Sequence, residues 1–291
     1  MYPRPFDYSR PETVAEAIEA LAGATVEARP IAGGQSLVPM MSLGLAQPGL
    51  LVDIGGLPLA GVERSNGSLA LGALTRHREL ERSRELGEQI PLAAEAAGHI
   101  GNPRVRNRGT LGGSISHADP ASELGAVALT YGGRAVIAGP EGERSVPIED
   151  FFEGFFITAV RPGELLTRVE LDLPPPGTGH GFCEIANRAD DFATAAATAL
   201  VTIDDRGACA EARLALAGVG DRPLRCAAAE ELCRGEPLDD DLLQRLTQTV
   251  IEEVSPEEDA FVSAEYRARA AGICAARALG AAWRRARGEP G

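Results

Sequence analysis

The sequence predicts an α+β protein with two domains, and three observations support this prediction. The chain has 291 residues, which is more than a single hydrophobic core normally uses. Short β-favouring runs alternate with helical stretches before residue 173, whereas a β-hairpin pattern and then helical patterns occupy the rest. The run 173–179 contains three consecutive prolines and can continue neither a helix nor an interior strand. We therefore expect domains at residues 1–176 and 177–291.

The composition excludes several classes of protein. The 28 basic residues are all arginine, so lysine-dependent phosphate loops and Schiff-base sites are ruled out. The 42 acidic residues give a net charge of −14, which argues against a nucleic-acid-binding protein. No apolar run is long enough for a membrane-spanning helix, and the start lacks a secretory pattern, so we expect a cytoplasmic protein.

The cysteines and histidines suggest neither a disulfide framework nor a metal site. The 5 cysteines contain no C-x-x-C pair, and the 4 histidines are scattered along the chain. We expect reduced, mostly buried thiols and no metal ligand set in this chain.

The first 57 residues are expected to form one lobe of the N-terminal domain. Ser9 and Glu12 have the spacing of a capping box, and an apolar stripe at residues 14, 18 and 21 predicts a helix that packs on a sheet. Runs 29–32 and 50–54 favour strands. The first strand run leads directly into a glycine pair.

Residues 58–176 are expected to form the second lobe. Strand-like runs at 68–71, 134–138 and 165–173 alternate with a helical stretch at 88–98. A second glycine-rich loop covers residues 109–114.

The remaining chain predicts an antiparallel sheet covered by helices. Runs 195–203 and 208–219 flank Asp204-Asp205-Arg206-Gly207, a typical hairpin turn. A helical stripe follows, and the last helix ends in arginines that suit the negative end of a helix dipole. The stripe and the terminal arginines are Leu242, Leu243, Leu246, Val250, Ile251 and Val254, then Arg284, Arg285 and Arg287.

The first glycine motif, Ala32-Gly33-Gly34-Gln35-Ser36-Leu37, follows a predicted strand. Two glycines in this place allow backbone N–H groups to approach an anion such as a pyrophosphate. A tight turn with no ligand is the alternative. The motif matches neither the nicotinamide-type G-x-G-x-x-G pattern nor the lysine-bearing phosphate loop.

The second motif is Arg106-Asn107-Arg108-Gly109-Thr110-Leu111-Gly112-Gly113-Ser114, followed by Ala118-Asp119-Pro120-Ala121-Ser122-Glu123-Leu124. Hydroxyl and N–H donors suit phosphates, and a carboxylate suits ribose hydroxyls. The combination favours binding of a dinucleotide. Arg104, Arg106 and Arg108 could face a cofactor, a partner subunit or only solvent.

These two motifs together resemble the FAD-binding medium subunit of the molybdenum hydroxylases, the family of carbon monoxide dehydrogenase and xanthine dehydrogenase. The resemblance runs from Pro5 to the C-terminal helices. It implies a two-lobed FAD-binding domain of the p-cresol methylhydroxylase and vanillyl-alcohol oxidase type, followed by a C-terminal domain of antiparallel sheet and helix bundle.

The resemblance also implies roles for individual residues around FAD. The first motif would hold the pyrophosphate, and the second would form another cradle. Glu123 stands where the family carries a cofactor-binding acid, usually Asp. The residues implied to bind FAD are Ala32, Gly33, Gly34, Gln35, Ser36, Leu37, Ile100, Thr110, Leu111, Gly112, Gly113, Ser114, Glu123, Leu166 and Phe192.

Phe192 lies in Asp191-Phe192-Ala193, which matches the family pattern D-[YF]-A and implies a side chain next to the flavin ring. A plain core phenylalanine is the alternative. The preceding stretch departs from the family, because it has a single Arg and places Asp190 where Gly is common.

The function implied by the resemblance is electron transfer within a hetero-oligomer, without a catalytic acid or base in this chain. A large subunit would oxidise the substrate at molybdopterin-bound molybdenum, and a small subunit with two [2Fe-2S] clusters would pass electrons to FAD. The assembly would be an (αβγ)2 hetero-oligomer. A self-sufficient FAD oxidoreductase of the vanillyl-alcohol oxidase type is the alternative, and a scaffold protein that has kept the fold is another.

Overall fold

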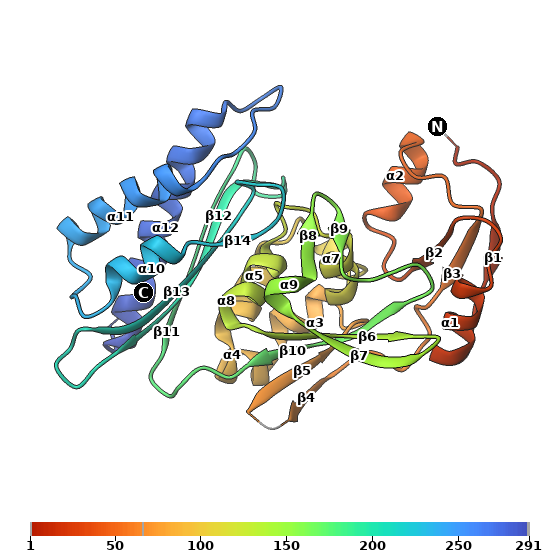
Figure 1. The fold of residues 1–291 in the computed structure, drawn as a ribbon, viewed down its shortest axis with the longest axis horizontal. Coiled ribbons are helices and arrows are strands. Elements are labelled where there is room, and N and C mark those ends of the chain that lie inside the picture. The colour runs from red at the N-terminus through yellow and green to blue at the C-terminus, as the bar shows by residue number, and fades with distance from the viewer. Residues whose placement is uncertain (1, 66, 290–291) are drawn as a thin grey trace.

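The computed structural model describes residues 2–65 and 67–289, which form an α+β structure as predicted. Figure 1 shows an N-terminal lobe, a central sheet with helices on one side, and a C-terminal sheet whose long helices cover its outer face. No helix in this described part of the chain is long and apolar enough to cross a bilayer.

The N-terminal lobe is a small parallel sheet with strand order β1-β3-β2. Helix α1 packs Ala17 and Leu21 against this sheet. Its predicted start was wrong: Ser9 ends β1, and the cap is Thr13, whose Oγ1 accepts a hydrogen bond from Glu16 N at 3.2 Å. The elements are β1 (Asp7–Ser9), α1 (Val14–Ala22), β2 (Ala28–Ile31), α2 (Leu37–Leu43) and β3 (Leu50–Asp53).

The central region is an antiparallel sheet with strand order β4-β5-β10-β6-β7. Its strands are β4 (Val62–Ser65), β5 (Ser68–Gly72), β6 (Gly133–Gly139), β7 (Gly142–Pro147) and β10 (Leu165–Asp172). A separate small hairpin pairs β8 (Phe152–Gly154) with β9 (Ile157–Thr158).

Helices pack on the central sheet and bury its core. The helix expected at 88–98 is two helices, because Ile90 leaves helical geometry before Pro91, whose ring cannot continue the preceding hydrogen-bond ladder. The helices are α3 (His77–Arg82), α4 (Arg84–Gln89), α5 (Pro91–His99), α6 (Pro103–Arg106), α7 (Leu111–His117), α8 (Glu123–Tyr131) and α9 (Ile148–Phe151).

The C-terminal region is the predicted antiparallel sheet, with strand order β11-β12-β13-β14. The hairpin turn is confirmed, since Asp204 N donates to Ala208 O at 2.8 Å and Gly207 has a φ of +78°. The elements are β11 (Gly179–Ala186), β12 (Ala193–Ile203), β13 (Cys209–Ala217), β14 (Leu224–Arg225), α10 (Ala227–Cys233), α11 (Asp240–Glu253) and α12 (Ala264–Ala286).

Strand β12 is rich in alanine because helices pack against both of its faces. Ala196 and Leu200 belong to the core shared with the central region, whereas Ala195 and Ala197 belong to the core under α10, α11 and α12. Small side chains on alternate faces allow both helical layers to come close. The central and C-terminal regions therefore share one apolar core.

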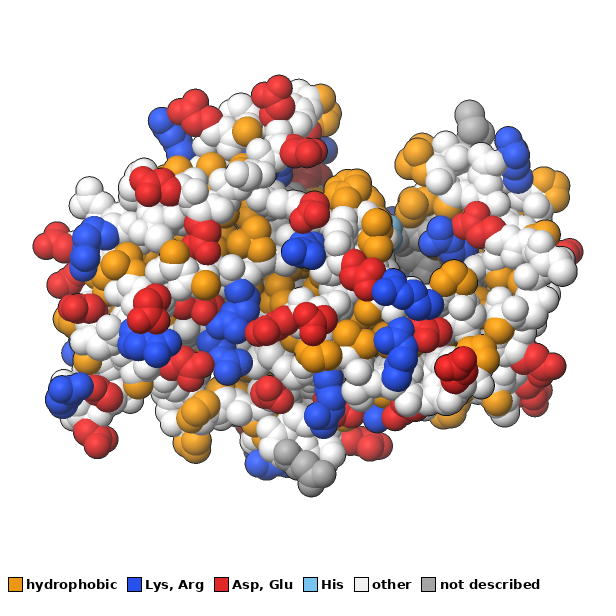
Figure 2. Space-filling view, viewed as in Figure 1, with side chains coloured by type: hydrophobic (Ala, Val, Ile, Leu, Met, Phe, Trp, Pro, Cys, Tyr) orange, Lys and Arg blue, Asp and Glu red, His pale blue; other side chains and the backbone are white. Residues whose placement is uncertain are grey.

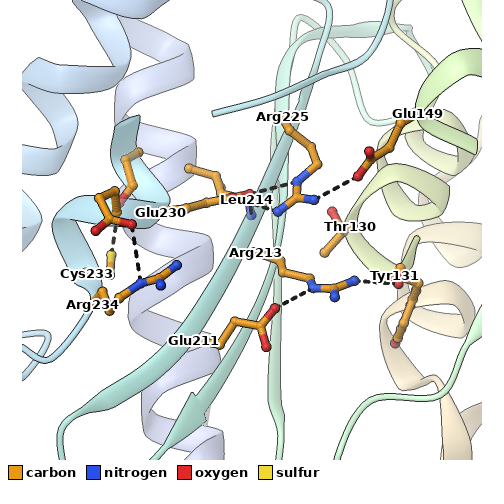
Figure 3. A network of polar contacts seen from close by, with 12 residues as sticks. Thr130, Tyr131, Glu149, Glu211, Arg213, Leu214, Arg225, Glu230, Cys233 and Arg234 are labelled. Carbon is orange, nitrogen blue, oxygen red and sulfur yellow. Dashed lines mark hydrogen bonds and ion pairs between the residues drawn. The ribbon is translucent and has the colours of Figure 1, made fainter. Parts of the chain in front are cut away.

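Polar contacts reinforce this junction, as Figure 3 shows. Arg225 of β14 pairs with Glu149 of α9 at 3.0 Å and with Glu230 of α10 at 2.6 Å. Arg213 of β13 donates from Nη1 to the carbonyl oxygen of Tyr131, at the end of α8, at 2.8 Å. Arg225 thus joins the two regions through ion pairs, and Arg213 of the C-terminal region caps the end of α8 in the central region.

Candidate functional site

The first glycine motif forms the loop between β2 and α2. Gly34 has a φ of +72°, a conformation that favours glycine, and it turns the chain into the helix. Among the described residues, the backbone N–H groups of Gly34, Gln35, Ser36 and Leu37 have no hydrogen-bond acceptor. Consecutive N–H groups left free in such a loop form a concave set of donors for an anion.

The second glycine motif is different, because the protein already uses its backbone donors. Leu111 N donates to Thr75 O at 2.9 Å, and Gly112 N donates to Ala73 O at 2.8 Å. Gly113 N donates to the side-chain oxygen of Thr110, the cap of α7, at 3.1 Å. These hydrogen bonds hold the start of α7 against the residues that follow β5. The backbone of Gly113 remains exposed to solvent.

The tertiary structure brings the two motifs into contact. A Cβ at Gly33 would lie 2.1 Å from the carbonyl oxygen of Arg108 and 3.0 Å from the Cα of Gly109. Arg76, which comes just before α3, also donates from Nη1 to that Arg108 carbonyl oxygen. Gly33 is therefore required by protein packing, a reason that is separate from the anion approach and the tight turn that the sequence predicts.

The same reasoning applies to Gly112, where a Cβ would lie 2.5 Å from the Cβ of Ala73. Both glycines allow backbone segments to pack without a gap. The contacts fix the loops relative to each other at the boundary between the N-terminal lobe and the central region.

The arginines of the second motif have separate environments. The Arg106 side chain is largely buried: it pairs with Glu81 at 3.1 Å and donates to the carbonyl oxygens of Ile100 and Gly101, both at 3.1 Å. It therefore holds the preceding loop in place. Arg104 and Arg108 are exposed.

Glu123 is a buried acid at the start of α8, with 7% of its surface exposed. Among the described residues its carboxylate has neither an ion-pair partner nor a hydrogen-bond donor from another residue. Burial is the main cause that raises the pKa of Glu123 to about 7; a hydrogen bond from its own backbone N–H opposes the shift, and the nearby carboxylates of Glu184 and Asp119 contribute to it. Such a carboxyl is suited to a ligand that supplies hydroxyl donors.

Three further predicted residues have distinct surroundings. Ile100 ends α5 and packs at the edge of the main core. Leu166 is buried in β10, opposite Ile137 of β6, so only its backbone could meet a ligand. Phe192 is 70% exposed in the loop before β12, which makes the alternative of a core phenylalanine wrong.

An aromatic cluster next to α7 was not predicted. The ring of Phe156, in the turn between β8 and β9, lies 4.8 Å from the ring of His117 at the end of α7. Phe156 and Ala118 are the non-glycine residues with positive φ in the described part of the chain, at +56° and +53°. One sequence signal existed, since residues 151–156 contain half of the 8 phenylalanines.

His117 also lies near the N-terminal lobe. Burial lowers the pKa of His117, Arg29 of β2 lowers it further, and Asp119 opposes the shift. Figure 2 shows the surface hollowed between the N-terminal lobe and the rest of the molecule, on the side where α2 and α7 face each other in Figure 1. The first motif lies at the boundary between these two parts of the molecule, because Gly33 packs against Arg108 and Gly109.

Comparison with known families agrees with this arrangement. Residues 4–174 match the family described as FAD binding domain in molybdopterin dehydrogenase, and residues 180–282 match the CO dehydrogenase flavoprotein C-terminal domain. The chain therefore belongs to the FAD-binding medium subunits of the molybdenum hydroxylase family, which are subunits of oxidoreductases.

Individual relatives are similar over nearly the whole chain. The chain is 36% identical to the 6-hydroxypseudooxynicotine dehydrogenase complex subunit alpha of Paenarthrobacter nicotinovorans, over 99% of this chain and 97% of the relative. It is 34% identical to the carbon monoxide dehydrogenase medium chain of Afipia carboxidovorans, over 99% and 100%. A solved carbon monoxide dehydrogenase from Hydrogenophaga pseudoflava superposes with a TM-score of 0.95 at 35% identity, covering 98% of this chain and 99% of that one.

Proposed function

We propose that this chain holds FAD and passes electrons from [2Fe-2S] clusters of a small partner subunit to an external acceptor. In this proposal a large partner subunit oxidises the substrate at a molybdopterin-bound molybdenum centre. The observation that carries the proposal is the run of N–H groups from Gly34 to Leu37, which have no acceptor in the described part of the chain and lie in a loop that packs on the second glycine motif.

The residues present fit the chemistry of FAD. A pyrophosphate needs several N–H donors, and those of the first motif are not used by any acceptor within residues 2–65 and 67–289. Ribose and ribityl hydroxyls need acceptors, and the buried Glu123 carboxyl has a free acceptor at the start of α8. The family match at residues 4–174 supports the same assignment.

The proposed roles follow from position. The phosphates would be held by the first motif, and the cofactor would extend along the open side of the second motif, with Glu123 at its hydroxyls. Ile100 and the backbone of Leu166 would bound the cofactor, and the exposed Phe192 would cover the flavin ring. The full set is Ala32, Gly33, Gly34, Gln35, Ser36, Leu37, Ile100, Thr110, Leu111, Gly112, Gly113, Ser114, Glu123, Leu166 and Phe192.

FAD, when bound, supplies the electron-transfer chemistry. The protein binds the phosphates, fixes the two lobes relative to each other and shields part of the cofactor from water. The buried Glu123 is a hydrogen-bonding group in this scheme, because its surroundings disfavour a free charge.

The proposal includes a division of the chain at residue 176, with N-terminal lobes at about 1–57 and 58–176. The two family matches, at 4–174 and 180–282, support a boundary in the proline-rich run. It also includes an (αβγ)2 assembly located in the cytoplasm. Relatives described as a complex subunit and as a medium chain support a multi-subunit assembly.

The first experiment is an absorbance spectrum and metal analysis of the protein with its co-purifying chains, before and after the chains are separated. We expect flavin absorbance to stay with this 30.4 kDa chain and molybdenum and iron to stay with two others. A yellow chain without partners that is reduced directly by a small organic substrate would establish the self-sufficient oxidoreductase instead. A colourless chain that takes up no FAD would establish the scaffold alternative.

A further inference from the structure

Helix α12 packs against strand β11 at very short range. A Cβ at Gly179 would lie 1.9 Å from the carbonyl oxygen of Ala282, and a Cβ at Gly181 would lie 1.9 Å from that of Ala278. The residue number rises along β11 while that of its partner falls along α12, so the strand and the helix run antiparallel. Two residues along a strand cover roughly 6.6 Å and four residues along a helix roughly 6 Å, so the two spacings match.

The next step of this register pairs Cys183 with Cys274. Cys183 lies two residues beyond Gly181 on the same face of β11, and Cys274 lies four residues before Ala278 on α12. Both side chains belong to the core between sheet and helix. Phe182 confirms the alternation, because its ring lies on the opposite face, 4.7 Å from the ring of His99.

The two thiols have different surroundings. Cys274 is fully buried, and its Sγ lies 3.6 Å from the carbonyl oxygen of Ala195. Cys183 is half-buried on β11, which is the edge strand of its sheet, so Cys183 is the more exposed of the two residues. The exposed Arg277 lies one helical turn after Cys274.

These neighbours make Cys183 the reactive member of the pair. The Cys274 thiol, as a hydrogen-bond neighbour, and the Arg277 guanidinium lower the pKa of Cys183 to about 7, against opposing effects of burial and Glu184. The same contact raises the pKa of Cys274. Burial raises the pKa of Cys209 to about 11 and that of Cys233 to about 12, and it also raises the pKa of Cys226.

We propose that Cys183 and Cys274 form a modification site that hydrogen peroxide converts into a disulfide joining β11 to α12. The Cys183 thiolate attacks one peroxide oxygen, the O–O bond breaks, and a sulfenic acid and one water result after protonation. The Cys274 thiol then attacks the sulfenic sulfur, forms the S–S bond and releases a second water. Each sulfur loses one electron, and the peroxide accepts both. This proposal does not depend on the proposed function.

The expected consequence is a covalent cross-link between helix α12 and β11, the edge strand of its sheet. It would close a loop that contains the whole of β12, β13 and α11. Because a cross-link restricts the unfolded chain, oxidation should raise the Tm of the protein.

The test is peptide mapping of the purified full-length protein after titration with hydrogen peroxide, with free thiols blocked by iodoacetamide. We expect one disulfide, between Cys183 and Cys274, that dithiothreitol removes. At pH 7.5 iodoacetamide should label Cys183 about tenfold faster than an ordinary exposed cysteine, because more of it is thiolate. A disulfide between Cys209 and Cys233, or no disulfide at all, would overturn the proposal.

Variants separate the two chemical steps. With Cys274→Ala, peroxide should leave Cys183 as a sulfenic acid that dimedone traps, and Tm should no longer rise on oxidation. Cys233→Ala is the matched control and should retain the disulfide. Arg277→Gln, at an exposed position, should slow the labelling of Cys183. Equal labelling of Cys183 in the wild type and in Arg277→Gln, together with dimedone adducts in the wild type, would rule out the proposed pair.

Discussion

The side-chain oxygens of Thr130 and Thr198 lie 2.7 Å apart, and both residues are completely buried. Thr130 belongs to α8 and Thr198 to β12, so this hydroxyl pair joins segments on either side of the proline-rich run. The Thr130 hydroxyl also donates to Ala126 O at 3.0 Å. The hydroxyl pair is the polar part of an apolar core that the two regions share.

Thr198→Val should lower the free energy of unfolding by about 1 kcal/mol, because it removes one buried hydrogen bond while Thr130 keeps its bond to Ala126. Urea unfolding followed by fluorescence and by circular dichroism measures this change. Because the core is shared, both probes should give one transition. Two separate transitions in the wild type would contradict the shared core.

Gly33→Val should yield protein with little bound flavin. Its side chain would collide with the Arg108 carbonyl and separate the two glycine motifs. The flavin-to-protein absorbance ratio of the purified variant measures the effect. Gly87→Ala is the control, since nothing lies within 4 Å of a Cβ at that exposed helical position. A Gly33→Val protein with stoichiometric flavin and unchanged affinity would remove the first motif from the proposed site.

Glu123→Ala should weaken FAD binding by roughly 1 to 3 kcal/mol, the range for losing a hydrogen bond to a polar or charged group. Titration of the flavin-free protein with FAD, followed by flavin fluorescence, gives the dissociation constant. Glu63→Ala, on the exposed face of β4, is the matched control and should not change it. An unaltered dissociation constant for Glu123→Ala would give Glu123 a purely structural role.

Glu123 should also make the flavin-free protein less stable as pH rises. Its pKa is raised to about 7 in the folded state, so between pH 4.5 and 7 the folded protein keeps a proton that the unfolded chain releases. The loss is about 3 kcal/mol across this window and then levels off. Relative to the wild type, Glu123→Gln should therefore gain stability as pH rises. A constant difference between the two proteins from pH 4.5 to 7.5 would refute the raised pKa.

Phe192→Ala should leave the free energy of unfolding within about 0.5 kcal/mol of the wild type, because the ring is mostly exposed. If the ring covers the flavin, the variant should alter the fluorescence of bound FAD and its rate of photochemical reduction. Phe261→Ala, at another exposed phenylalanine, is the control. Identical flavin properties in the two variants would mean that Phe192 does not cover the flavin.

Much of the fold could be predicted because local patterns decide it. The apolar spacing of α1 and α11 and the Asp204–Gly207 turn act over a few residues, and the structure confirms them. The proline-rich run lies between the end of β10 and the start of β11. Errors arose where a neighbouring element decided the outcome. Ser9 joins a strand that pairs with a segment over 40 residues later, so it is unavailable as a helix cap.

The candidate site also combines features that the sequence predicts with features that only the tertiary structure determines. The sequence alone identified both glycine motifs and Glu123, because unusual residue types at fixed spacing carry that information. It could not show that Gly33 is small to accommodate Arg108, that the donors of the second motif are already used, or that Glu123 is buried without a partner. These properties depend on which distant backbone atoms come within a few ångströms, and only the packing of the lobes determines that.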